Sequence, residues 1–584
     1  TFWHAKYDER SAGSVIPAAS SARRPMEPSS RSRSCRRTRE VGKGTLRRVS
    51  ADPPAHIPPA RDPADRPVPT PVSGDTWLDF AIRAVIPGTI GTILIAIGAL
   101  GIGWLPLDTA LLDNPVVDAL RSTTLGAVVS KTALVAGVVL LLQSWLLLGY
   151  DVMRGQDRDI KRLWIALAAW CAPLMLCPPL FSRDVYSYFA QGKLMVAGID
   201  PYTRGSSSVP GWFNDGVDPM WAEAPTPYGQ FWLLLAKGVA QFTGPHPYSG
   251  ALMMRLLTVA GVVMLAWAIP KIAFHGGIAP SKALWLGVLN PLVLMHFVAG
   301  AHNDALMVGL IAAGFAVTLE RLPILGVVLV TLGGSVKPIG LVALPFIGLL
   351  WAGASPRWPK IWLRWVYTGL ISGAMLAVLA IYTKTGLGWI EAIATPGEVR
   401  TWLSPPTAVG MAIGGFVGLF GFDVTDNTVA IARMVGTVAT VVILFWLCLR
   451  PWGRTPIRAA ALALFTLVAL GPVVQPWYVL WSLPLFAAAG LNRIELKTAL
   501  IGTAGFTLFG LVTSSATQDS LVQVSDAVGL VVVAVVIALL LAVSPRERRL
   551  VLGEQEDRGI APDDPPAQAR ARLLTMRRPD ESRL

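Results

Sequence analysis

Long apolar runs follow one another along the chain from about Trp77 to Val543, and each is bounded by a few polar residues, Pro or Gly. Because a helix that crosses the hydrocarbon core of a bilayer needs about 20 apolar residues, this region divides into roughly 12 to 14 membrane spans. Only 15% of the 584 residues are charged, whereas soluble domains average about 25%. The sequence therefore predicts an all-α polytopic membrane protein whose single membrane domain covers residues 76–545.

The two ends of the chain differ in composition from this domain. Residues 1–73 contain 14 Lys/Arg and 7 Asp/Glu, a net +7 of the chain's +13, and they are rich in Ser, Pro and Arg. Such a segment cannot bury enough apolar surface to fold. We expect residues 1–75 to form a disordered cytoplasmic arm attracted to anionic membrane lipids rather than to nucleic acid. Residues 546–584 are expected to form a cytoplasmic tail, and the first span to insert as an anchor rather than a cleaved signal.

Cysteine and histidine usage gives no sign of a bound metal or cofactor. Cys171 and Cys177 are six residues apart within one predicted span, and Cys448 lies in another, so all three are interpreted as small core residues. Neither a disulfide framework nor a metal-ligand cluster is visible. We expect no cofactor.

Lys and Arg concentrate in short loops on the cytoplasmic side of membrane proteins. Two weaker apolar segments, 231–242 and 408–422, are interpreted as interfacial or re-entrant elements, which protein-buried irregular backbone permits. All the basic loops then lie inside: 154–162, 271–282, 355–364, 450–458, 492–497 and 544–549. The segments expected outside are 182–229, 299–304, the turn at Lys337, 383–406 and 473–478.

The stretch FSRDVYSYFAQG (181–192) places a carboxylate directly after an apolar segment. In a helix that starts at Asp184, this residue shares one face with Ser187, Tyr188 and Gln191, and apolar residues occupy another face. We therefore expect an extracytoplasmic amphipathic helix in the membrane interface. A carboxylate near a helix N-terminus is stabilised as the anion, which suits a catalytic base. The alternative is that Asp184 only caps the helix.

The loop 182–229 continues with aromatic side chains alternating with polar and acidic ones. Flat aromatic faces beside hydrogen-bonding groups can hold a sugar through its apolar C–H surface and its hydroxyls. Aromatic residues also anchor any membrane protein at the interface, so both interpretations stay open for each residue. The candidate sugar- or acceptor-binding residues in this part of the chain are Tyr186, Tyr188, Gln191, Asp200, Tyr202, Trp221 and Tyr228.

Further along, the triplet His302-Asn303-Asp304 interrupts a hydrophobic hairpin. Ionisable residues at membrane depth are expensive, so they indicate function. A metal site is disfavoured, because His296 and His302 are six residues apart and no second ligand pair lies nearby. Substrate hydrogen bonding, or pairing with Lys or Arg, is the expected role of all three residues.

The residues predicted to bind a phosphate are basic. Lys337 precedes Pro338 at a break between two short apolar runs in residues 324–353, where a compact charge and free backbone N–H groups can hold a phosphate. Snorkelling of the lysine to the headgroups is the alternative. Arg400 and Arg183 are further candidates. VVQPWY (473–478) adds Gln475, Trp477 and Tyr478 as sugar- or acceptor-binding candidates.

The expected sidedness limits the donor. Asp157-Arg158-Asp159 resembles the Asp-x-Asp pair of nucleotide-sugar enzymes, but it lies in a basic cytoplasmic loop and is interpreted as a solvated charge run. Outside the membrane there is no nucleotide pool, so a sugar donor there must be lipid-linked. A polyprenyl phosphate leaves as an anion, so one base for the attacking hydroxyl and cations for the phosphate suffice. Such a single displacement inverts the anomeric centre.

Several motifs together resemble one family. FSRDVYSYFAQG, GIDPY, APTPYG, ALWLGVLNPLVLMH, AGAHND and LMVGL are similar to the actinobacterial polyprenyl-phosphomannose-dependent α-(1→6)-mannopyranosyltransferases of lipomannan and lipoarabinomannan synthesis, in the GT-C superfamily. The resemblance runs from about Asp79 to Val543 and implies a GT-C-like multi-span bundle. It also implies that Asp184 matches the superfamily's early extracytoplasmic acid.

The resemblance further implies the substrates: polyprenyl-phosphomannose as donor and a mannan on a phosphatidylinositol-mannoside-type lipid as acceptor. Residues 181–183 and 190–192 favour the subtype that elongates the distal mannan over the one that initiates it. Two other functions remain open. A GT-C enzyme of different chemistry would perform α-(1→2)-mannosyl or arabinofuranosyl transfer. A lipid-linked-sugar flippase would show inverted repeats and polar groups at the midplane.

Overall fold

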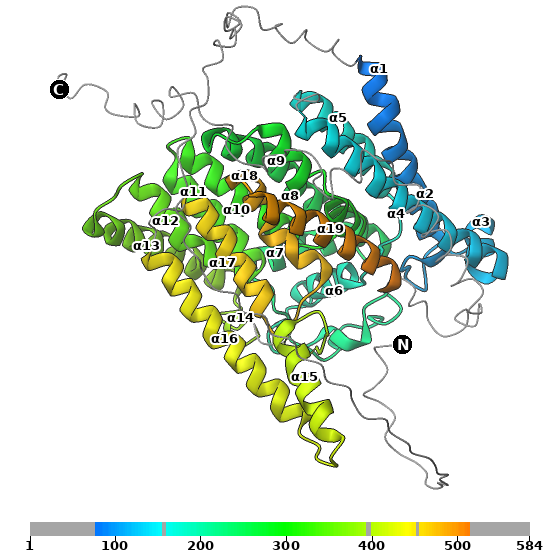
Figure 1. Ribbon diagram of the computed structural model, residues 1–584. Helices are drawn as coiled ribbons and strands as arrows, with labels where there is room; N and C mark the ends of the chain where they lie inside the picture. The colour runs from blue at the N-terminus through cyan, green and yellow to red at the C-terminus, as the bar shows by residue number, and fades with distance from the viewer. Residues whose placement is uncertain (1–75, 155–158, 393–396, 398, 451–454, 514–584) are drawn as a thin grey trace, which may run out of the picture. The chain divides into compact units, whose positions relative to one another are not determined.

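The computed structural model describes residues 76–154, 159–392, 397, 399–450 and 455–513, and every regular element in these residues is helical (Figure 1). This confirms the predicted all-α class. The predicted basic arm (1–75), the predicted tail (546–584) and the last part of the predicted membrane domain (514–545) lie outside the described residues.

Six helices in the described part of the chain are long and apolar enough to cross a membrane, which confirms a multi-pass membrane protein. The first span is continuous over three elements, α1 (Trp77–Phe80), η2 (Ala81–Val85) and α2 (Ile86–Ile102). The other five are α4 (Thr124–Met153), α8 (Pro247–His275), α13 (Trp358–Thr383), α16 (Thr425–Leu449) and α19 (Arg493–Thr513). A seventh span is present if the bent pair η6 (Val293–Ala299) and α10 (Asp304–Leu319) counts as one.

Within the described residues, several of the apolar runs form two or more short helices instead of one long helix. The run 324–353 is the clearest case: it forms α11 (Pro323–Val336), η7 (Pro338–Ala343) and α12 (Leu344–Ala352), with the predicted break at Lys337. The remaining short elements are α3 (Pro115–Ser122), α5 (Ile160–Cys171), η3 (Ala172–Met175), α6 (Asp184–Val196), η4 (Ser206–Ser208), η5 (Pro219–Trp221), α7 (Gln230–Thr243), α9 (Pro280–Gly287), α14 (Trp389–Ala392), α15 (Pro405–Gly418), α17 (Pro456–Leu470), η9 (Pro476–Trp481) and α18 (Leu483–Ala489).

The buried centre of the bundle is formed by η6, α8, α9, α10 and α18 (Figure 1). α10 is buried along nearly its whole length. Backbones approach closely where α8 crosses α10, because Gly261 faces Gly309: a Cβ on Gly309 would lie 2.4 Å from the Gly261 carbonyl oxygen. Small residues at such crossings are typical of helix packing inside membranes.

By contrast, α13 and α16 run along one flank of the bundle (Figure 1) and expose large apolar side chains. A helix that is apolar on its exposed face is suited to lipid rather than to water. The most exposed of these side chains on the two helices include Leu370, Val378, Ile381, Ile431, Val435, Val438 and Val442.

Candidate active site

The site is built around an interruption in the helical backbone between η6 and α10. The axes of these two helices differ by 111°, and residues 300–303 make the connection. Ala301 adopts a positive φ of 52°, and Phe181, just before α6, adopts 67°. Non-glycine residues rarely take this conformation, and such strain concentrates at functional sites. This confirms the predicted interruption at His302-Asn303-Asp304. The connection brings His302 close to Asp184 at the start of α6.

Asp184 is the first residue of α6, as predicted. Its backbone N–H donates to the Ser182 hydroxyl at 3.0 Å. Its carboxylate Oδ2 lies 3.4 Å from His302 Nδ1, and its side chain is 20% exposed whereas that of His302 is fully buried. Burial alone would raise the pKa of Asp184, but the contact with His302 and the charge of Lys337 hold this pKa below its ordinary value. The Asp184 carboxylate is therefore partly exposed, and its surroundings favour its charged form.

Lys337 lies at the break between α11 and η7, and its side chain reaches Asp304 at the start of α10. Its ammonium Nζ donates to Asp304 Oδ1 at 2.8 Å, and the side chain is 12% exposed. Nζ also lies 4.7 Å from the ring centroid of Tyr478 and 5.0 Å from that of Trp481. The indole Nε1 of Trp481 donates to the same Asp304 oxygen at 2.6 Å. One cation is thus held by a buried carboxylate and two aromatic faces.

Aromatic rings pack beside Asp184 and Lys337. Trp477 stacks on His302, with ring centroids 3.7 Å apart and planes at 22°. His296 lies 5.2 Å from Trp477 and 5.4 Å from Phe181, measured between ring centroids. This packing fixes the orientation of the His302 imidazole beside Asp184.

Buried polar atoms without a hydrogen-bond partner gather at this place. Buried polar groups in proteins are nearly always paired, and the 3.4 Å contact between His302 and Asp184 is longer than an ordinary hydrogen bond. Such unpaired atoms are suited to hydrogen bonding with a ligand that carries many hydroxyls. The unpaired atoms in the described residues around Asp184 are both ring nitrogens of His296 and of His302, both amide atoms of Asn303, Asp304 Oδ2, the Tyr188 hydroxyl, Gln191 Oε1 and Trp477 Nε1.

Comparison with known proteins identifies the family of this chain. Residues 85–353 match the family described as "Alpha-(1->6)-mannopyranosyltransferase, N-terminal domain", and residues 406–547 match the "MptB C-terminal domain". Alpha-(1→6)-mannopyranosyltransferase A of Mycobacterium tuberculosis is 35% identical over 435 residues, which cover 73% of this chain and 83% of that protein. The chain belongs to the α-(1→6)-mannopyranosyltransferase family.

Two further relatives show the breadth of the similarity. A probable alpha-(1→6)-mannopyranosyltransferase of Mycolicibacterium smegmatis is 34% identical over 74% of this chain and 85% of its own length. Alpha-(1→6)-mannopyranosyltransferase B of Corynebacterium glutamicum is 31% identical over 73% of this chain and 76% of its own length. No solved structure gives a significant match. Within this family member, Asp184, His302, Asp304 and Lys337 all fall in the N-terminal match, whereas η9 belongs to the C-terminal one.

Two of the predicted site residues on α6 and beside it hold the fold together. The Arg183 guanidinium donates to the carbonyls of Gly216 and Val217 at 2.8 and 3.0 Å, and it lies 4.5 Å above the Trp104 ring. The Tyr186 hydroxyl donates to the Trp104 carbonyl at 2.8 Å. These contacts attach the 197–229 loop and the segment after α2 to α6. Both side chains therefore hold in place the N-terminal end of α6, where Asp184 lies.

The predicted amphipathic character of α6 needs correction. Ser187, Tyr188 and Gln191, the expected polar face, are all buried, and so are Val185 and Phe189 of the apolar face, whereas Val196 at the end of the helix is exposed. The helix packs between other elements, and the Tyr188 ring makes T-shaped contacts with both Tyr228 and Trp232. The three polar residues lie on α6 as predicted, but they contact other parts of the protein.

The remaining predicted residues have other contacts. Asp200 Oδ1 accepts from the Tyr202 backbone N–H at 3.0 Å, and the Tyr202 hydroxyl donates to the Tyr228 carbonyl at 2.8 Å, so this pair orders the loop. Trp221 ends the short helix η5 and is half-buried. Arg400 Nη2 pairs with Asp426 Oδ1 at 2.7 Å beside the start of α16.

The sequence analysis missed part of the site. Trp481 holds Asp304, and His296 and Phe181 extend the aromatic wall. The available signal for Trp481 was its spacing, three residues after Tyr478 in PWYVLW, which places both on one side of the 3₁₀ helix η9. Gln475 is the residue before η9 and is half-buried. The described residues contain no group of three or more His, Cys, Asp or Glu side chains that could hold a metal ion.

Proposed function

We propose that this protein is an inverting mannosyltransferase that moves mannose from polyprenyl-phosphomannose to the 6-hydroxyl of a mannan chain on a phosphatidylinositol-mannoside-type lipid. The reaction takes place on the outer face of the plasma membrane. Membership of the α-(1→6)-mannopyranosyltransferase family supports the sugar and the linkage. The observation that carries the mechanism is the convergence of a charged, reachable Asp184 with the buried Lys337–Asp304 pair.

In this mechanism Asp184 accepts the proton of the acceptor 6-hydroxyl while the hydroxyl oxygen forms a bond to C1 of mannose. The bond between C1 and the phosphate oxygen breaks, and its electron pair leaves with the polyprenyl phosphate. Because a single displacement inverts the anomeric centre, an α product requires a β-linked donor. Lys337 stabilises the charge that develops on the leaving phosphate.

His302 has a positioning role. It is fully buried, stacks on Trp477 and approaches the Asp184 carboxylate at 3.4 Å. The contact favours the charged form of the carboxylate, which is the form that can accept a proton. The unpaired amide of Asn303 and the free oxygen of Asp304 are available for the mannose hydroxyls.

The outer location rests on the basic loops and on helix length. α10 has 16 residues, and a helix of this length rises about 24 Å. Its far end is tied to the end of α8 by the ion pair between Lys271 and Glu320, in a basic loop assigned to the cytoplasm. In a hydrocarbon core about 30 Å thick, Asp304 then lies near the outer boundary, where a lipid phosphate and a periplasmic acceptor can meet.

The deciding experiment incubates membranes containing the protein with radiolabelled polyprenyl-phosphomannose and a short α-mannoside, and then determines the linkage of the product. Asp184→Asn is expected to lower kcat by about 100-fold or more, because general base catalysis contributes about 10²–10⁴-fold. The control is Asp113→Asn, which changes an exposed carboxylate after α2 and should retain full activity.

Three outcomes contradict the proposal. Full activity of Asp184→Asn removes the assignment of the base. A product with an α-(1→2) linkage or with arabinofuranose identifies a GT-C enzyme of different chemistry. Movement of labelled donor across the membrane without any product identifies a flippase.

A further inference from the structure

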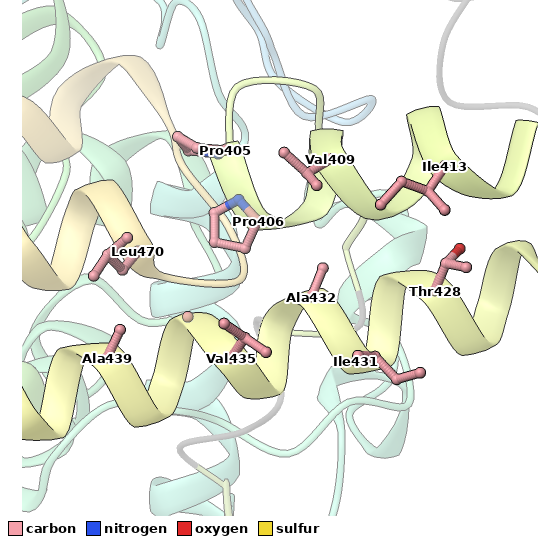
Figure 2. Close-up of a pocket in the computed structure, with 11 residues that line it drawn as sticks. Pro405, Pro406, Val409, Ile413, Thr428, Ile431, Ala432, Val435, Ala439 and Leu470 are labelled. Atoms are coloured by element: carbon pink, nitrogen blue, oxygen red, sulfur yellow. The ribbon is translucent and has the colours of Figure 1, made fainter. Parts of the chain in front are cut away.

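An apolar groove lies between α15, α16 and the end of α17, away from Asp184. Figure 2 shows Pro405, Pro406, Val409 and Ile413 of α15 on one side of it and side chains of α16 on the other, with Leu470 of α17 at one end. Its volume is about 580 Å³. Apart from Thr428, the lining side chains are hydrocarbon or glycine, namely Pro405, Pro406, Val409, Ile413, Ile431, Ala432, Val435, Gly436, Ala439 and Leu470.

Two arginines flank this groove. Arg433 follows the lining residue Ala432 on α16, and its guanidinium donates to Thr407 Oγ1 at 2.9 Å and to the Val399 carbonyl at 2.8 Å. Val399 is the residue before Arg400, so this hydrogen bond brings the two arginines close together. Its partner Asp426 is 83% exposed, and exposed ion pairs contribute little free energy. An incoming anion can therefore displace the carboxylate from Arg400.

Hydrogen bonds also connect the groove region to the segment that leads into η9. Thr407, which accepts from Arg433, donates its own hydroxyl to the Pro472 carbonyl at 2.7 Å. Residues 473–475 then lead directly into η9 with Trp477 and Tyr478.

We infer that this groove binds the polyprenyl chain of the lipid-linked donor, with Arg400 and Arg433 attracting its phosphate on the way to Lys337. This inference rests on the proposed function. The groove is lined almost entirely by hydrocarbon and has a volume of about 580 Å³, which suits a hydrocarbon chain. A polyprenyl phosphate has one such chain, whereas a bilayer phospholipid has two. Arginine is suited to phosphate because its planar guanidinium can donate two parallel hydrogen bonds.

The test is photocrosslinking of the full-length protein in nanodiscs with a diazirine-bearing polyprenyl phosphate that carries no sugar, followed by peptide mapping. Labelling of 405–413 and 428–439 that polyprenyl phosphate suppresses and excess phosphatidylglycerol does not supports the groove. Labelling that phosphatidylglycerol suppresses equally, or labelling elsewhere, overturns it. Because the probe has no mannose, this result does not depend on transfer activity.

A kinetic arm uses matched variants. Ala432→Trp fills the groove and is expected to raise the donor KM about tenfold with little change in acceptor KM. Val438→Trp adds the same bulk to the exposed face of α16, outside the groove, and should leave both values unchanged. Arg400→Gln, at an exposed position, is expected to raise the donor KM as well. If wild-type transfer occurs and neither Ala432→Trp nor Arg400→Gln changes the donor KM, the groove assignment fails and the proposed function stands.

Discussion

At the scale of single residues, the site depends on a few charges that are held by buried partners. His302 and Lys337 hold the pKa of Asp184 below its ordinary value, and Lys337 is kept in place by Asp304 and two aromatic rings. Taking a charge out of water is costly unless it is paired. Each of these residues therefore affects both the chemistry and the stability of the site, and variants must separate the two.

His302→Gln is expected to move the acid limb of the pH–rate profile upward. The base form of Asp184 is present above its folded pKa, which lies below the ordinary value, so the wild-type rate should be flat from neutral pH down to about pH 5. Removing the imidazole removes the main influence that opposes burial, so the pKa of Asp184 rises and activity falls at a higher pH. The measurement is kcat/KM between pH 4 and 8. His246→Gln, at an exposed position, is the control, and an unmoved acid limb in His302→Gln refutes the role.

Lys337→Met should destabilise the protein by about 3–5 kcal/mol, because the buried Asp304 carboxylate loses its partner. The double variant Lys337→Met/Asp304→Asn removes both charges and should recover most of this loss in thermal melting. Donor binding should not recover with it. We expect the donor KM of the double variant to stay raised by about tenfold or more, since a hydrogen bond to a charged group is worth about 1.5–3 kcal/mol. A double variant with wild-type donor KM contradicts the phosphate role of Lys337.

At the scale of elements, the site is assembled from helix ends and breaks. Asp184 begins α6, Asp304 begins α10, Lys337 separates α11 from η7, and Trp481 ends η9. The position of α10 is set by its contact with α8, where two glycine backbones touch. Helix packing therefore determines where Asp304 lies relative to Lys337.

Gly309→Val is expected to force α8 and α10 apart and to lower stability by about 1–3 kcal/mol, the usual cost of overpacking. Activity should fall more than stability, because Asp304 at the start of α10 moves away from Lys337. Gly369→Val is the matched control, since a Cβ at this position of α13 meets nothing within 4 Å. Both variants are compared by thermal melting in detergent and by transfer assays. If the two variants have the same stability and the same activity, the expected mechanism is excluded.

At the scale of the whole molecule, the function requires one orientation in the membrane. The loop between α6 and α7 must face outward with Asp184, while the basic loop before α13 must face the cytoplasm. Both loops present exposed residues, such as Glu223 and Arg357, that can report their side.

We expect a cysteine at Glu223 to react with a membrane-impermeant maleimide on intact cells, and a cysteine at Arg357 to react only after the membrane is opened. Both are introduced after the four native cysteines have been replaced. Labelling in the reverse order would place Asp184 where the proposed donor does not act, and the mechanism would fail.

Much of the architecture was predictable from short stretches of sequence. Hydropathy predicted the long spans, Lys337-Pro338 predicted the break after α11, and the pattern from Asp184 predicted the start of α6. These features are local, because the solvation of a short segment and the missing N–H of proline do not depend on remote contacts. They determined a multi-pass helical protein with Asp184 and Lys337 among its candidate residues.

The tertiary structure decided which candidates meet. Residues 184, 302, 337 and 477 come together only because α6, the η6–α10 connection, the break between α11 and η7, and η9 pack around one point. No local pattern encodes that packing. It also decided that α6 is buried on both faces, that Arg183 and Tyr186 support the fold, and that Trp481 completes the site. The physical reason is that burial and pairing depend on neighbours distant in the chain, whereas hydropathy and backbone preference depend on the segment alone.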